Sequence, residues 1–134
     1  LELDTGITKD GVAILDHDPV VQAEKCRRAD GFPYERDEVL VRDFTLAQLQ
    51  ATFVCDKLFR GPEQQNDPAL SPVTAVFAAR AALPSLYAMP SLDQVFAFVD
   101  EYVAYYTRGA GAGHPEAARR ATNAGRVRFN IETK

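Results

Sequence analysis

Apolar and polar side chains alternate at the start of the chain, where Leu1 and Leu3 enclose Glu2 and Asp4 follows. Successive side chains of a β-strand point to opposite faces. The pattern therefore predicts a strand with the two leucines on one face and the two carboxylates on the other. Two carboxylates on one face repel each other unless a cation or hydrogen-bond donors lie between them.

A hairpin is predicted next, because Asp10-Gly11 lies between the apolar residues Ile7 and Val12. Residues that tolerate positive φ at this spacing are typical of a tight primed turn. The predicted return strand, Val12 to Leu15, brings Asp16-His17-Asp18 back beside the carboxylates of the first strand. One short hairpin thus combines a pair of acids with a histidine.

A second strand with alternating side chains is predicted at residues 127–134, where Val127, Phe129 and Ile131 form an apolar face. Glu132 and Lys134 fall on its polar face. If this strand lies in the same sheet as the first one, polar faces together, Glu132 joins the acids at positions 2 and 4. Three carboxylates and a lysine indicate a hard divalent cation and an anionic substrate.

Between these ends the pattern is mostly helical. Two capping boxes, Thr45-x-x-Gln48 and Ser91-x-x-Gln94, predict helices that end before Gly61-Pro62 and at Gly109. The other expected elements are a short strand at 39–41, a surface loop at 62–71, and helices at 73–83 and 115–123. Because a βαβ crossover needs only about 30 residues, residues 19–126 are expected to contain a mostly helical insertion.

The composition of the chain argues against nucleic-acid binding and against a membrane span. The chain of 134 residues has 46% hydrophobic and 25% charged residues, as an ordinary globular domain does. Its net charge of −4 gives no general attraction to nucleic acid or to an anionic membrane. No apolar run approaches the roughly 18 residues that a membrane span requires. Cys26 and Cys55 do not form a C-x-x-C motif and are expected to be unpaired. A disulfide between them stays open only if the full protein is exported.

The motifs at the two ends resemble those of the glycerophosphodiester phosphodiesterase family. They are Glu2-x-Asp4, Thr8-Lys9-Asp10-Gly11, His17-Asp18 and Ile131-Glu132-Thr133-Lys134. In the middle of the chain, residues 43–46 and 90–95 also resemble segments of that family. The resemblance implies part of a (β/α)8 TIM barrel with a mostly helical insertion, divided into 1–18, 19–126 and 127–134. Such a barrel typically needs about 250 residues, so we expect the chain to be an internal portion of a longer enzyme and inactive alone.

The resemblance also implies the chemistry. Glu2, Asp4 and Glu132 would bind Mg²⁺ or Ca²⁺, His17 would act in acid–base catalysis and Lys134 would stabilise the phosphate. The substrate would be a small glycerophosphodiester, split into glycerol 3-phosphate and an alcohol. A second catalytic histidine, in a His-Arg pair, is expected on the strand that precedes the chain. The oligomeric state is not predicted.

Two alternatives stay open. One is a related barrel phospholipase, similar to sphingomyelinase D or phosphatidylinositol phospholipase C, and the other is a barrel that binds metal or phosphate without turnover. Three further features are assigned no catalytic part: Asp10-Gly11 is expected only to form the turn, His114 to cap a helix at the surface, and Gly109–Gly113 to form a flexible turn. Asp18 is a candidate to orient its neighbours.

Overall fold

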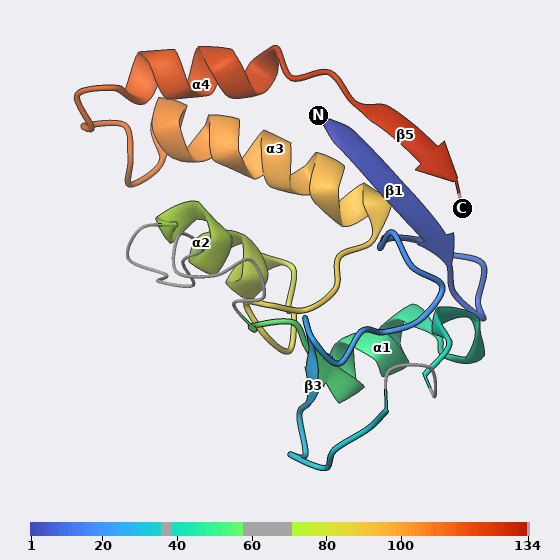
Figure 1. Cartoon of the computed structure of the whole chain (residues 1–134). Coiled ribbons are helices and arrows are strands. Elements are labelled where there is room, and N and C mark those ends of the chain that lie inside the picture. Colours follow the sequence, from blue (N-terminus) through green and yellow to red (C-terminus); the bar gives the residue numbers. More distant parts are fainter. Residues whose placement is uncertain (36–38, 58–70, 134) are drawn as a thin grey trace.

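The computed structural model describes residues 1–35, 39–57 and 71–133 (Figure 1). Within these ranges the chain is a mixed α/β structure with four α-helices, a three-stranded sheet and a two-stranded sheet. The described strands do not close into a barrel. Lys134, most of the predicted loop at 62–71 and the predicted helix end at Gly61-Pro62 lie outside the described residues.

The three-stranded sheet joins the two ends of the chain in the order β2-β1-β5. Its strands are β1 (Glu2–Ile7), β2 (Ala13–Leu15) and β5 (Asn130–Thr133). β1 runs antiparallel to β2 and parallel to β5, and Figure 1 shows β1 and β5 side by side. The predicted common sheet is therefore confirmed, although β5 begins at residue 130 and not at 127.

The predicted hairpin is present, but its turn is wider than the primed two-residue turn expected. The connection runs from Thr8, whose N–H donates to the Val12 carbonyl at 3.0 Å, and among its described residues only Gly11 has a positive φ, of 78°. Asp10 does more than form the turn. Its Oδ1 accepts from the Thr8 hydroxyl at 2.6 Å and from the Leu46 N–H at 3.1 Å, which links the hairpin to the start of a helix. The Thr8 hydrogen bond lowers the pKa of this carboxyl.

That helix, α1 (Leu46–Thr52), begins at the predicted capping box: Gln48 N–H donates to Thr45 Oγ1 at 3.2 Å, and Thr45 N–H to Gln48 Oε1 at 2.9 Å. The predicted continuation toward Gly61 is wrong. Phe53 is fully buried, with its ring edge-on to the rings of Tyr34 and Phe44, and this packing draws the chain out of the helix into β4 (Phe53–Val54).

β4 pairs antiparallel with β3 (Arg27–Arg28), and a disulfide connects the residue before β3 to the residue after β4. Cys26 and Cys55 are bonded to each other, so the expectation that they are unpaired is wrong. The two cysteines are 29 positions apart and become neighbours through the β3–β4 pairing, which no local sequence pattern predicts.

The predicted strand at 39–41 is also wrong. A single bridge joins Val20 to Leu40, and a 3₁₀ turn, η1 (Val41–Asp43), follows.

The remaining helices follow the sequence pattern closely. They are α2 (Pro72–Arg80), α3 (Leu92–Arg108) and α4 (Ala117–Gly125), against predictions of 73–83, 91–109 and 115–123. α3 has the second predicted capping box and contacts β2, and α4 lies against it (Figure 1). None of the described helices combines the length and the apolar character that crossing a membrane requires.

Two apolar clusters hold these elements together. One lies beneath the hairpin, and its completely buried members are Ile14, Val21, Leu49 and Phe53. The other joins α2, α3 and α4 through Val73, Tyr106, Ala117 and Ala121. Because Ile14 also bridges to Ser91, the start of α3 is fixed against β2.

Replacing Ser91 by alanine is expected to lower the free energy of unfolding by about 1 kcal/mol. Ser91 Oγ accepts from the Gln94 N–H at 3.1 Å, and alanine offers no acceptor in its place at this buried helix start. Urea denaturation measures the change. Ser71→Ala is the matched control, since Ser71 makes no side-chain cap bond at the start of α2. Equal losses in the two variants would contradict the capping role.

The Cys26→Ala/Cys55→Ala double variant is expected to lose about 3–4 kcal/mol of stability, the chain-entropy value for a closed loop of this length. Denaturation with and without a phosphine reductant tests the expectation: the reductant should destabilise the wild type and leave the double variant unchanged. A thiol titration of the unfolded, unreduced protein should find neither cysteine reactive. Two reactive thiols would show that the bond is absent.

Candidate active site

The acids predicted at the two ends of the chain meet on neighbouring strands. In the parallel pairing of β1 and β5, Asp4 lies directly beside Glu132, and Glu2 lies beside Asn130. Thr5 fixes this arrangement, because its buried hydroxyl donates to the Glu132 carbonyl at 3.0 Å. Neighbouring residues of a parallel pair point to the same face, so the carboxylates at positions 2, 4 and 132 share one face of the sheet.

His17 follows β2, where that strand ends. The Leu15 N–H donates to the Pro90 carbonyl at 3.0 Å, which fixes the end of β2 against the segment leading into α3. The histidine side chain is exposed, and its Nδ1 lies 3.4 Å from Asp18 Oδ1. The sequence-based suggestion that Asp18 orients a neighbour agrees with this contact.

A cavity of about 510 Å³ lies between β1, the end of β2 and the insertion. The predicted site residues Glu2, Asp4 and His17 all line it, whereas Glu132 does not. Its other wall comes from the insertion and includes Lys25, the disulfide and the segment Tyr87 to Pro90. Acids, an imidazole and an ammonium group around one open cavity can bind a phosphate ester and exchange protons with it.

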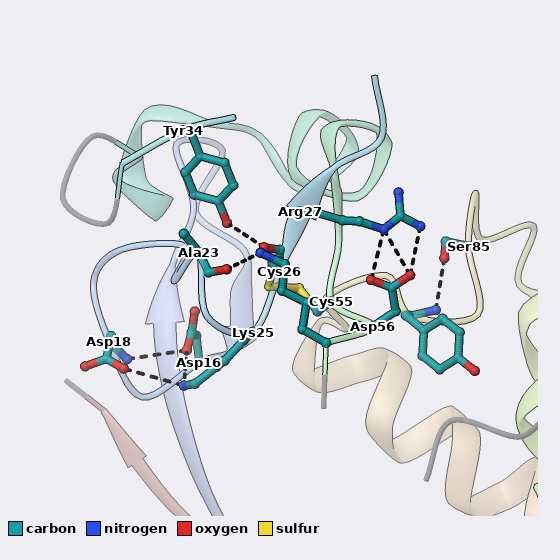
Figure 2. The surroundings of a disulfide bond; sticks show 12 residues. Asp16, Asp18, Ala23, Lys25, Cys26, Arg27, Tyr34, Cys55, Asp56 and Ser85 are labelled. Atoms are coloured by element: carbon teal, nitrogen blue, oxygen red, sulfur yellow. Dashed lines mark hydrogen bonds and ion pairs between the residues drawn. A yellow bond between two sulfur atoms is a disulfide. The ribbon is translucent and has the colours of Figure 1, made fainter. Parts of the chain in front are cut away.

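The lysine in this cavity, Lys25, was not foreseen, whereas Asp16 was expected here but was given no role. Lys25 Nζ lies 3.8 Å from Asp16 Oδ1 and 3.6 Å from Asp18 Oδ2, as Figure 2 shows. Burial raises the pKa of the Asp16 carboxyl, and the Lys25 charge opposes this shift. Lys25 stands in a stretch without clear periodicity, so no sequence signal separates it from a surface lysine.

The strand register is what supports binding of a divalent cation by these residues. The strand register brings Asp4 and Glu132 together, and Glu2 follows on the same face. In residues 1–35, 39–57 and 71–133, however, no three histidine, cysteine or acidic side chains gather closely enough to hold a metal ion. Metal binding by Glu2, Asp4 and Glu132 therefore stays a prediction. Oxygen ligands of this kind suit Mg²⁺ or Ca²⁺ and not a soft metal.

His114 lies away from this cavity, as expected. It stands between α3 and α4, and its Nδ1 accepts a hydrogen bond from the Glu116 N–H at 3.1 Å. Its exposed ring is edge-on to that of Tyr106, with 6.0 Å between centroids. His114 is thus a surface residue, as expected, but it does not cap the helix: the N-cap of α4 is Glu116, and this helix start has no side-chain cap bond. Lys134 lies outside the described residues, so its predicted part at the phosphate stays a prediction.

Comparison with known proteins identifies a fold likeness. No family model matches the sequence, and no curated protein matches it. Among solved structures, the chain is similar to a protein from Silicibacter pomeroyi DSS-3 described as a candidate glycerophosphoryl diester phosphodiesterase. The TM-score is 0.51 at 19% sequence identity, and the likeness covers 100% of this chain but only 35% of that protein. At this identity the likeness shows a shared fold only. The chain has the same fold as about a third of that protein.

Proposed function

We propose that this chain is a portion of a (β/α)8 barrel enzyme that hydrolyses glycerophosphodiesters to glycerol 3-phosphate and an alcohol. One observation carries the proposal: Asp4 is paired with Glu132 on neighbouring strands and lines one cavity together with Glu2 and His17. The name of the structural neighbour and the end motifs support the same activity.

Glu2, Asp4 and Glu132 would hold a divalent cation, Mg²⁺ or Ca²⁺, which when bound neutralises a phosphate oxygen of the substrate. His17 would give a proton to, or take one from, the oxygen that leaves or attacks phosphorus, because an imidazole titrates near neutral pH. Lys134 would add positive charge at the phosphate. A small-molecule glycerophosphodiester suits the open cavity of about 510 Å³.

In the full-length protein that carries this chain, His17→Ala and Glu2→Gln are each expected to lower kcat/KM for glycerophosphocholine at least about 100-fold. The assay is release of glycerol 3-phosphate at saturating Mg²⁺ or Ca²⁺. His114→Ala is the matched control and should retain wild-type activity, because His114 lies outside the cavity. Near-normal turnover in either site variant would remove that residue from the mechanism. A panel with sphingomyelin and phosphatidylinositol distinguishes the related phospholipases.

Metal binding has a test that does not depend on turnover. Mg²⁺ or Ca²⁺ is expected to raise Tm by several degrees, since a ligand at 100 times its Kd adds about 2.7 kcal/mol of stability. Asp4→Asn should abolish this shift, because it removes one of the proposed carboxylate ligands. Asp100→Asn, an exposed change on α3, is the control and should keep the shift. A wild-type shift in Asp4→Asn would contradict the metal site.

A further inference from the structure

The acidic residues on either side of His17 are connected to one lysine. Lys25 reaches both Asp16 and Asp18, at 3.8 and 3.6 Å, from a loop seven residues beyond Asp18. The side chain of Asp16 is only 9% exposed, and those of Asp18 and Lys25 are 27% and 28% exposed. Ion pairs at this depth are less screened than pairs at the surface.

Both carboxylate oxygens of Asp18 have partners. Gln22 Nε2 donates to Oδ2, the oxygen that Lys25 approaches, and the other oxygen, Oδ1, lies 3.4 Å from His17 Nδ1. A carboxylate at Nδ1 favours the tautomer with the proton on that nitrogen. The other ring nitrogen, Nε2, is then left as the base.

The backbone around Lys25 is equally constrained. The N–H groups of Lys25 and Cys26 both donate to the Gln22 carbonyl, at 3.1 and 2.9 Å, so residues 22–26 form a tight turn. The next residue, Cys26, is bonded to Cys55, and the Lys25 carbonyl accepts from the Lys57 N–H at 3.2 Å. Figure 2 shows the lysine extending from this anchored turn toward the two aspartates.

We propose that Lys25 is a positioning residue, which holds Asp18 so that the carboxylate orients His17 with Nε2 directed toward the substrate. The charge of the lysine also offsets Asp16, which lines the cavity, and Asp18 next to His17, and this cavity must admit an anionic phosphodiester. This inference rests on the catalytic part proposed for His17, so its test includes a readout that does not require turnover.

The kinetic test compares three variants in the full-length protein. Lys25→Met, which keeps the length of the side chain but not its charge, is expected to lower kcat for glycerophosphocholine about 10–100-fold, the usual cost of losing such a supporting contact. KM should change less than about twofold. Lys25→Arg should recover most of the activity. Lys57→Met is the matched control: it removes the same charge close to the same turn, from a side chain that does not line the cavity.

Three kinetic results would overturn the proposal. A rise in KM with unchanged kcat would mean that Lys25 binds the phosphate itself. Equal losses in Lys25→Met and Lys57→Met would mean that the loop is only being destabilised. An unchanged kcat in Lys25→Met would mean that the contact has no part in catalysis.

The second arm is ¹⁵N NMR of histidine-labelled protein, with the His17 signals identified from their loss in His17→Ala. Neutral His17 is expected to carry its proton on Nδ1 in the wild type, and to shift toward the Nε2-protonated form in Lys25→Met and in Asp18→Asn. An unchanged tautomer in Lys25→Met would refute the positioning role. If the wild type hydrolyses no glycerophosphodiester, the proposed function fails, and this spectrum still decides whether the lysine orients the imidazole.

Discussion

The parallel pairing of β1 with β5 is the contact on which the candidate site depends. Segments at opposite ends of the chain meet there in one register, with Asp4 beside Glu132, and the Asn130 N–H donates to the Leu1 carbonyl at 2.8 Å. A slip of one residue would turn Glu132 to the opposite face of the sheet. Two adjacent carboxylates weaken this pairing unless positive charge lies near them. The pair Asp4 and Glu132 is therefore the most demanding electrostatic feature of the sheet, and the proposed function depends on it.

The insertion between the hairpin and β5 is structurally part of the same site. Pro90 and Ser91, at the start of α3, contact β2 through a hydrogen bond and a bridge, and Tyr87 accepts from the Cys55 N–H at 2.9 Å. Residues 87–90 then form one wall of the cavity that the β1 acids and His17 line on the other side. Because the disulfide and the turn at 22–26 complete that wall, the shape of the cavity is set by residues far from the acids in sequence.

Elements whose signals are local could be predicted from the sequence. The helix starts at Thr45 and Ser91 have reciprocal bonds to a glutamine three residues later, and the hairpin has its glycine at a positive φ. The end of α1 could not be predicted in this way, because Phe53 leaves the helix for contacts with Tyr34 and Phe44. The Cys26–Cys55 bond was missed for the same reason: it follows from the pairing of two-residue strands, which are too short to show a periodic pattern.

By itself the sequence determined which side chains share a strand face, where the main helices begin, and that acids and a histidine stand at matching ends of strands. Alternation and capping involve residues two to four positions apart, so the local sequence alone is enough to predict these features. Only the tertiary structure decided that Asp4 and Glu132 share a register, that residues 87–90 and Asp4 line one cavity, and that Lys25 reaches the aspartates beside His17. Those contacts join residues that are distant along the chain, and they form only when buried side chains such as Ile14 and Phe53 bring the segments together.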